Sequence, residues 1–428
     1  MFKNHKAFSS ILAVVISISL LLGGLAFSTF GKTTVEFWTR NSREEVMPFV
    51  DAFEDKYPDI SVKIQALTGD VQVTTKLTAA VQGGGAPDVV GLDVVDVKKF
   101  VEMDALYPLD EFIKEDDIKV DSFSTGMMGM ARVEGKIYGL PWGGDSSVIF
   151  YNKDHFREVG LDPENPPSSW AEFTEAARKL TRDTNGDGET DQYGFAYVPA
   201  HSWVTTFYWL PYFWSNGGEF FEDGQVALNS EAGVEALTFL VDLYRKYDAV
   251  PSSVIGPDAD ALRLFKMGRV SMKFEGPSDI PTMENDVPDL DLGVMTHPTP
   301  DGEPADHNFC GGDIGVIMKS SNKKEAAWKF VKYITSPEGQ MLWTEGAYVP
   351  TREELLETEY YQTHPARRTA LKALLNSHKP PVTSHYAKIQ TYLRDAFMKA
   401  SKGQMTPKEA LDWATEKSNK LIEESGTK

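Results

Sequence analysis

The sequence predicts an α/β protein built from at least two compact lobes, and three observations lead to this prediction. Short apolar segments alternate with amphipathic helical segments from residue 34 onward, which is the pattern of β-α-β units with mostly parallel strands. The chain has 428 residues, 41% of them hydrophobic, and this length suggests two or three domains rather than one. No internal repeat and no long linker interrupts the chain. Each lobe is therefore expected to be compact, with a sizeable buried core.

The individual elements follow from the residue pattern. Residues 34–39 (TVEFWT) are apolar enough for a buried strand, and residues 61–67 and 88–92 are two further strand candidates. Between them, residues 42–57 carry apolar side chains at helical spacing, and residues 71–82 can form a second helix. Four later helices are predicted, with starts at Ser169, Ser230 and Thr406-Pro407 and one over residues 327–334 that ends at Ser336-Pro337.

The N-terminus has the pattern of an export signal. Lys3 and Lys6 precede an apolar run from Ile11 to Ala26. A basic start and about 15 apolar residues are typical of a secretory signal peptide, whereas a membrane anchor, the alternative, needs about 20. We expect residues 1–28 to be removed. No cysteine follows the run, so a lipid-anchored form is not expected, and the mature protein should work in the periplasm or outside the cell.

Charge, cysteine content and motifs exclude several classes of protein. Lys and Arg total 43 against 63 Asp and Glu, a net charge of −20 without a basic cluster, so we expect no nucleic acid partner. Cys310 is the single cysteine, which excludes an internal disulfide and a thiolate zinc site. The standard hydrolase, zinc-protease and nucleotide-binding motifs are absent. We therefore expect a binding protein, and because glycosidase carboxylates have no fixed spacing, a secreted glycoside hydrolase is the enzyme alternative.

Aromatic residues are concentrated between His201 and Phe221. Sugars present flat C–H faces that pack on such rings, while their hydroxyl groups need polar partners. One face of a helix cannot bury all nine rings, so we expect about half in the core and two or three facing a cleft. The nine are Trp203, Phe207, Tyr208, Trp209, Tyr212, Phe213, Trp214, Phe220 and Phe221.

The segment DTNGDGETDQYG, residues 183–194, matches the first half of a calcium-binding loop. Oxygen-bearing residues alternate, and Gly188 stands at the sixth position, where such loops turn sharply. Gly194 stands at the twelfth position instead of a bidentate Glu. Two interpretations stay open: a structural calcium site, or a polar turn held by Asx hydrogen bonds. No cofactor is required otherwise. The candidate metal ligands are Asp183, Asn185, Asp187, Glu189 and Asp191.

Sharp turns follow several of the apolar strand candidates, where open α/β sheets bind their ligands. They are Trp38–Asn41, Gly91–Asp93, Leu140–Asp145, Phe274–Ser278 and Cys310–Asp313. Each turn carries a ring, a charge or an open backbone, and together they predict a binding cleft. Four of their residues are expected to converge around one gap, namely Trp38, Trp142, Asp145 and Gly312.

The chain also resembles a known family. The motifs VEFW, PDVV, GLPW, IFYNKD, SSWAEF, DTNGDGETDQYGF, WSNGGEFF, FEGPSD, AAWKFVKYITSPEGQ and YVPTREE follow the export signal in the order seen in extracellular sugar-binding proteins of ABC importers, of the maltose-binding type. The resemblance covers nearly the whole mature chain. It implies a two-lobed type II periplasmic-binding-protein fold, with three crossing segments and hinge closure on the ligand.

The resemblance also implies lobe boundaries and site residues. The N-lobe would comprise residues 32–143 and 292–334, and the C-lobe residues 144–291 and 335–428, with Gly143-Gly144 at a hinge crossing. Ser278 stands where many members have a stacking tryptophan, a role that Trp203 or Trp209 would take. The other implied cleft residues are Trp38, Arg40, Asn41, Asp93 (or Asp96), Asp145, Gly311, Gly312, Asp313 and Arg352.

These features together predict a carbohydrate receptor that hands its ligand to the permease subunits of an ABC importer without catalysis. We expect it to act as a monomer. A protein of the same architecture for a peptide or a phosphorylated polyol is the binding alternative. A phosphate ligand would need several basic residues at helix starts, and only Arg40 and Arg43 are obvious.

Overall fold

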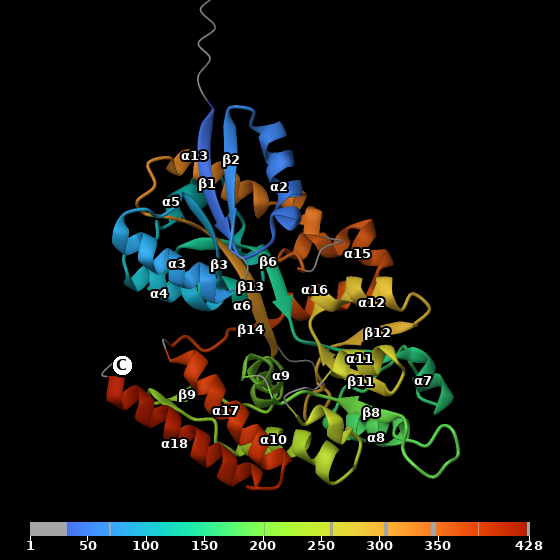
Figure 1. Ribbon diagram of the computed structural model, residues 1–428. Helices are drawn as coiled ribbons and strands as arrows, with labels where there is room; N and C mark the ends of the chain where they lie inside the picture. The colour runs from blue at the N-terminus through green and yellow to red at the C-terminus, as the bar shows by residue number, and fades with distance from the viewer. Residues whose placement is uncertain are drawn as a thin grey trace, which may run out of the picture.

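The computed structural model describes residues 32–67, 70–200, 202–256, 260–303, 307–343, 348–383 and 385–425. The expected export signal lies outside these residues. Two main sheets, of six and four strands, each have helices packed against them and define an N-lobe and a C-lobe (Figure 1). This confirms the predicted two-lobed α/β class. Across the described parts of the chain, none of the helices combines the length and the apolar character needed to span a bilayer.

The N-lobe sheet is built around β1 (Thr33–Thr39). This strand runs parallel to β2 (Ile60–Ala66) and to β3 (Val89–Asp93), which confirms the three strands predicted from the sequence. β13 (Asn308–Ile317) runs antiparallel to β3 and to β6 (Gly139–Ser146). At its beginning, β13 also pairs with the two-residue β14 (Ser377–His378).

Helices cover both faces of this sheet. In α2 the Ser42 side chain accepts from Glu45 N–H and the Glu45 side chain accepts from Ser42 N–H, a capping box that fixes where the helix begins. Its apolar stripe packs into a core in which Phe37, Phe53 and Phe330 are at most 1% exposed. The helices of the N-lobe are α2 (Arg43–Lys56), α3 (Asp70–Gly83), α4 (Val97–Glu102), α5 (Asp110–Glu115), α6 (Thr125–Ala131) and α13 (Lys324–Ile334).

The C-lobe sheet has the order β12–β7–β11–β8. β8 (Tyr193–Ala196) and β11 (Val270–Glu275) are parallel, whereas β7 (Val148–Asn152) runs antiparallel to both β11 and β12 (Leu292–Met295). This sheet is therefore mixed, in contrast to the mostly parallel arrangement expected. The reason is that β7 enters directly from β6 of the other lobe, so no β-α-β unit sets its direction.

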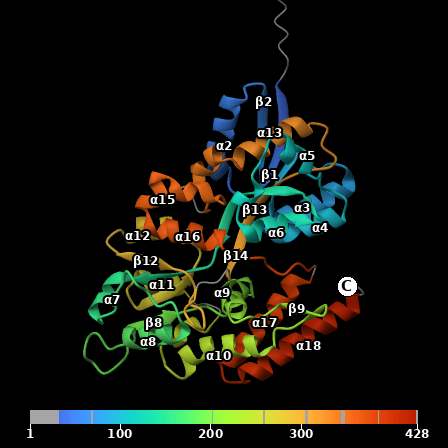
Figure 2. The ribbon, with the colours of Figure 1, turned by 180° about the vertical axis from the view of Figure 1, so that it is seen from behind.

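The C-lobe helices include the predicted ones. Ser169 and Ser230 each accept a hydrogen bond from the helix they precede, as their sequence context predicts. The long helices α17 and α18 pack against each other and against α9 and α10 (Figures 1 and 2). The helices are α7 (Lys153–Glu158), α8 (Trp170–Leu180), α9 (Ser202–Ser215), α10 (Glu231–Arg245), α11 (Ala261–Lys266), α12 (Ile280–Asp286), α17 (Tyr386–Ser401) and α18 (Pro407–Ser425).

The chain passes between the lobes at three places, and each lies later in the chain than the predicted boundary, the first by three residues. The first crossing follows β6, which stays paired with β13 up to Ser146. The second lies between β12 and β13, because β12 belongs to the C-lobe sheet, so the boundary at 291/292 is wrong. The third follows β14, which belongs to the N-lobe sheet, so the boundary at 334/335 is also wrong.

The lobes share one apolar cluster along one side. α16 (Pro365–Leu375) contacts β6 and β13 of the N-lobe and β12 of the C-lobe. Phe150 and Val294 of the C-lobe sheet lie in the same buried cluster as Ile314 and Leu374. This cluster holds the two lobes together beside the crossings. The shorter elements nearby are α14 (Pro337–Gln340) and α15 (Glu359–Thr363).

Candidate functional site

A charged cluster lies where β1, β3 and β13 meet. Arg40 follows the end of β1, and its Nη1 donates to Asp93 Oδ2 at 2.7 Å. Arg40 Nε lies 2.7 Å from Asp313 Oδ1. Asn41 Nδ2 donates to Asp313 Oδ2 at 2.9 Å and to Thr39 Oγ1 at 3.2 Å. The structure thus brings Arg40, Asn41 and Asp93 together at the ends of β1 and β3, where an α/β sheet binds its ligand. Asp313 lies opposite Asp93 in the middle of β13.

Asp145 joins this cluster from β6 and faces the C-lobe. Its backbone lies opposite Gly311 in the β6–β13 pairing, and its Oδ1 accepts a hydrogen bond from Ser146 N–H at 2.9 Å. Burial raises the pKa of Asp145 to about 7, while the charge of Arg40 acts to lower it and that of Asp279 to raise it. The Asp145 carboxyl group therefore interacts electrostatically with a charged residue of each lobe.

The C-lobe contributes the turn after β11. A Cβ atom placed on Gly276 would lie 3.2 Å from Asp145 Oδ1 and 3.4 Å from Ser278 Oγ, so this turn lies directly against Asp145. Ser278 is exposed and Asp279 is half-buried. Asp145 and Ser278, both implied as cleft residues by the family resemblance, therefore lie close together, and Asp279 is an additional charged residue beside them.

Two tyrosine rings face the cluster, and neither was assigned to the site from the sequence. Tyr348 is half-buried, and Arg40 Cζ lies 5.8 Å from the centre of its ring. Burial raises the pKa of Tyr348 well above its usual value, and the charges of Asp313, Asp145 and Asp93 act in the same direction. Burial also raises the pKa of Tyr208, as do Asp145 and Asp279. Tyr208 was named only among nine aromatic residues, and Tyr348 only within the motif YVPTREE.

The side chains of Trp38 and Asp96 make their contacts with α3 rather than with this cluster. Trp38 is 7% exposed, and the ammonium group of Lys76 lies 4.9 Å from its ring. Asp96 accepts a hydrogen bond from Thr74 of α3, whereas Asp93 pairs with Arg40. Of the two carboxylates considered from the sequence, Asp93 is the one that the structure places in the site.

Trp142 does not reach the cleft, so the prediction that it would is wrong. Its ring is fully buried in the N-lobe core and packs edge-on against Phe37 and Phe49, at 5.8 and 5.7 Å between ring centres. The β6–β13 register shifts between Asp313 and Ile314, which leaves Trp142 as an extra residue in β6. Such a bulge breaks the alternation of side chains along a strand. The predicted convergence of four residues therefore fails at Trp142.

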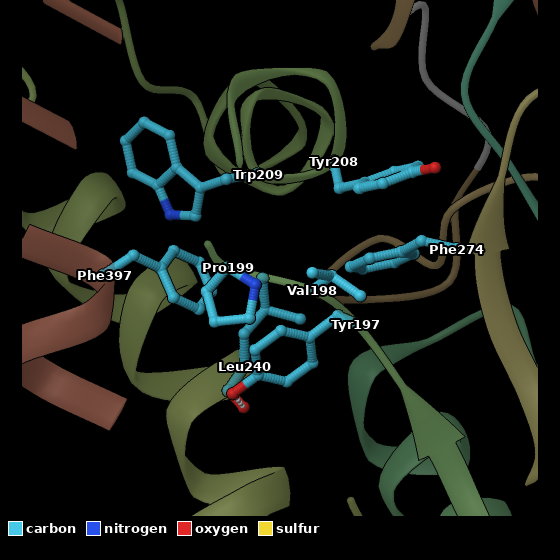
Figure 3. A pocket seen from close by; sticks show the side chains of 8 residues that line it. All are labelled: Tyr197, Val198, Pro199, Tyr208, Trp209, Leu240, Phe274 and Phe397. Atoms are coloured by element: carbon cyan, nitrogen blue, oxygen red, sulfur yellow. Dashed lines mark hydrogen bonds between the residues drawn. The ribbon is translucent and has the colours of Figure 1, made fainter. Parts of the chain in front are cut away.

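Trp209 and Arg352 are also placed elsewhere. Trp209 is fully buried and stacks on Phe213 with 4.8 Å between ring centres. Figure 3 shows it lining a small apolar pocket of the C-lobe, in which Tyr208 stacks on Phe274 and its hydroxyl group points away from Trp209. Arg352 donates to Glu354 and lies 4.4 Å from the centre of the Phe123 ring. The predicted cleft roles of both are wrong, and the side chain of Trp203 lies outside the described residues.

The glycines between the charged residues allow two strands to approach closely. Gly312 has φ +116°, and a Cβ atom there would lie 2.3 Å from Gly143 O. A Cβ atom on Gly144 would lie 2.1 Å from Leu374 Cδ2 of α16. Gly144 was predicted to permit hinge rotation, but in this structure close packing already explains the absence of a side chain.

Gly312→Ala is expected to lower the free energy of unfolding by about 3 kcal/mol, because it combines a left-handed backbone with a clash against backbone atoms. Denaturant unfolding of the purified protein measures this change. Gly83→Ala is the matched control, since Gly83 has open space around its Cβ position and no positive φ. A Gly312→Ala protein as stable as the control would show that the β6–β13 approach is not tight.

The acidic segment after α8 forms a hydrogen-bonded turn. Asp183 accepts from the N–H groups of Asn185, Gly186 and Gly188 at 2.6 to 3.1 Å, and Asn185 Nδ2 donates to Asp191 at 2.9 Å. Among the residues that the structure describes, no three acidic, His or Cys side chains are grouped so that they could hold a metal ion. This geometry matches the Asx-turn interpretation, and calcium binding stays a prediction.

The fold and the site together define a class of protein. Two α/β lobes joined by three crossings place carboxylates, an arginine and tyrosine rings between them, which is the arrangement of a type II two-lobed ligand-binding protein. Comparison with known proteins gives the family. The chain belongs to the bacterial extracellular solute-binding proteins, whose family model matches residues 39–341, and this confirms the predicted family.

Individual relatives differ in the ligands that they are named for. The periplasmic sn-glycerol-3-phosphate-binding protein of Escherichia coli is 23% identical over 441 residues, covering 96% of both chains. A substrate-binding protein of Listeria monocytogenes, solved with cycloalternan, is 25% identical with a TM-score of 0.75, covering 93% of this chain and 100% of that one. A solute-binding protein of Thermotoga lettingae, solved with α-D-tagatose, is 28% identical with a TM-score of 0.72, covering 91% and 100%.

Proposed function

We propose that this protein binds a neutral carbohydrate in the cleft and delivers it, chemically unchanged, to the permease of an ABC importer. The observation that carries the proposal is the convergence of Arg40, Asp93, Asp313, Asp145 and Tyr348 between the lobes. Carboxylates accept hydrogen bonds from hydroxyl groups, and tyrosine rings pack on the C–H faces of a sugar. The relatives solved with cycloalternan and tagatose support a sugar ligand.

The charge of the site favours a neutral ligand over a phosphate ester. A phosphate needs cationic donors that are free to face it, but the Arg40 guanidinium already lies within 2.7 Å of both Asp93 and Asp313. Asp279 adds further negative charge nearby, and Asp145 does so when it is ionised. An anion placed here would meet more carboxylates than cations. The similarity to the glycerol-3-phosphate-binding protein keeps a phosphorylated polyol as the second candidate.

The cellular setting is part of the same proposal. Residues 1–28 would direct export and be removed, and the mature monomer would act in the periplasm or outside the cell without a lipid anchor. Membership of the extracellular solute-binding family supports the extracytoplasmic location.

A ligand panel tests the proposal. We expect one class of neutral mono- or oligosaccharide to raise the melting temperature and to change tryptophan emission saturably, while sn-glycerol-3-phosphate and peptides do not. At a ligand concentration of 100 Kd, the stabilisation should be about 2.7 kcal/mol. Asp93→Ala should abolish the shift because it removes a ligand acceptor, whereas Asp55→Ala, at an exposed position of helix α2, should not.

Other outcomes would contradict the proposal in distinguishable ways. A shift with sn-glycerol-3-phosphate alone would establish the phosphorylated-polyol alternative. Release of reducing ends from an oligosaccharide of the panel would establish a hydrolase, since Asp145 has the raised pKa that a catalytic acid needs. A panel without any response from sugars would refute the carbohydrate assignment.

A further inference from the structure

The C-lobe buries an ion pair beside the ligand site. Along β11, Met272 and Phe274 point into the C-lobe core, so the alternation of a strand places Lys273 and Glu275 on the opposite face. Lys273 is 3% exposed and Glu275 9% exposed. Lys273 Nζ pairs with Glu275 Oε2 and lies 6.0 Å from the centre of the Phe150 ring. Because a buried ion pair is costly to desolvate, its presence calls for a reason beyond stability.

This ion pair is connected to the turn that forms the C-lobe side of the site. The second carboxylate oxygen of Glu275, Oε1, accepts a hydrogen bond from Gly276 N–H at 3.1 Å. Gly276 is the residue whose Cβ position lies 3.2 Å from Asp145 Oδ1. A series of contacts therefore runs from Lys273 through Glu275 to Gly276, which lies beside Asp145 in the cleft.

The charge of Asp279 acts on both Lys273 and Asp145. It acts to raise the pKa of Lys273 and also to raise the pKa of Asp145. Burial lowers the pKa of Lys273 to about 7, with Asp260 and Asp279 acting against this change and Lys266 in the same direction. The position of the 276–279 turn thus sets how strongly the charge of Asp279 raises the pKa of Asp145.

We propose that the Lys273–Glu275 pair is a positioning element of the ligand site, which holds the 276–279 turn against Asp145. The pair does not touch the ligand. It sets the place of Ser278 and Asp279, and through them the protonation and the hydrogen-bonding capacity of Asp145. The inference rests on the proposed function only in taking this cleft as the ligand site.

Three variants of the full chain test the proposal without any ligand. Lys273→Met leaves Glu275 without its cation, and Glu275→Gln weakens the acceptor of Gly276 N–H. The double variant Lys273→Met with Glu275→Leu removes both charges and fills the space with apolar groups, which keeps the lobe folded. Lys153→Met is the matched control, since Lys153 also pairs with a carboxylate of the C-lobe, Glu164, at 2.9 Å.

Two measurements are made on each variant: hydrogen exchange of the 276–279 backbone and the titration of the Asp145 carboxyl carbon by NMR, assigned with Asp145→Asn. We expect the double variant to speed exchange at Gly276 by about tenfold, because the N–H loses its acceptor, Glu275 Oε1. Lys273→Met should speed it in the same direction, because the Glu275 carboxylate is no longer held in place by its cation. The pKa of Asp145 should fall by about one unit as the turn moves away and water enters. The control should change neither value.

Two results would overturn the proposal. One is an Asp145 titration and a 276–279 exchange rate that both remain as in the wild type in the double variant. The other is faster exchange spread evenly over the C-lobe with an unchanged Asp145 pKa, which would give the pair a structural role alone. Because no ligand enters these measurements, a failure of the sugar panel leaves them unaffected and the two proposals fail independently.

Discussion

Replacing Arg40 by methionine is expected to abolish ligand binding and to lower the free energy of unfolding by about 3 to 5 kcal/mol. Arg40 is the cation between Asp93 and Asp313, and the Asp313 side chain is only 1% exposed. Removing the guanidinium leaves the buried Asp313 carboxylate without this cation, beside the second carboxylate of Asp93. These charges then repel each other and weaken the contact of the ends of β1 and β3 with β13.

Calorimetric titration with the sugar found in the panel, and denaturant unfolding of the same samples, measure both effects. Arg43→Met is the matched control, because Arg43 is an exposed residue at the start of α2 and lies only three positions away. Arg40→Lys should lose most of the affinity as well, since an ammonium group cannot contact two carboxylates in the forked geometry of a guanidinium. Wild-type affinity in Arg40→Met would contradict the location of the site.

Asp145→Asn is expected to remove a loss of stability that the wild-type protein shows as the pH rises. The pKa of Asp145 is about 7 in the folded protein and about 3.9 in an unfolded chain. Between these values the folded state holds a proton that the unfolded state has released, so the free energy of unfolding falls with increasing pH. From pH 5 to pH 8, the wild type should lose about 3 kcal/mol relative to Asp145→Asn.

The measurement is denaturant unfolding of both proteins at pH 5 and pH 8, and the difference between the variants isolates Asp145 from other titrating groups such as Lys273. Sugar affinity should follow the opposite trend. A hydroxyl group donates to the ionised carboxylate, so binding should tighten as the pH rises through 7 in the wild type and stay constant in Asp145→Asn. If the unfolding free energies of the two proteins changed in parallel between pH 5 and pH 8, Asp145 would be ionised throughout this range.

Local sequence pattern predicted the elements whose side chains alternate or recur without interruption. Strand β1 and helix α2 are examples, since the apolar run TVEFWT and the apolar side chains at helical spacing over residues 42–57 are local features of the sequence. The strand ends carrying Arg40 and Asp93 followed from these elements, because ligand sites of α/β sheets form at such ends.

The errors arise where distant segments decide the outcome. Trp142 follows an apolar strand and precedes Gly143, so nothing local distinguishes a cleft residue from a core residue. Its burial depends on a bulge opposite Asp313, which is 171 positions away by residue number (313 − 142). The lobe boundaries failed for the same reason, because β12 and β14 take their places through pairing with β7 and β13. Tyr348 reaches Arg40 only in the folded chain.

Helix α16 touches strands of both halves of the molecule, and this shared contact limits how the halves can move. A rotation that separated them along this side would expose Phe150, Val294 and Leu374 to water, at a cost of about 2 kcal/mol for each side chain. Any opening for a ligand is therefore expected on a side of the molecule away from α16. The two lobes should therefore rotate about an axis beside α16, so that the shared apolar cluster stays buried while the cleft opens.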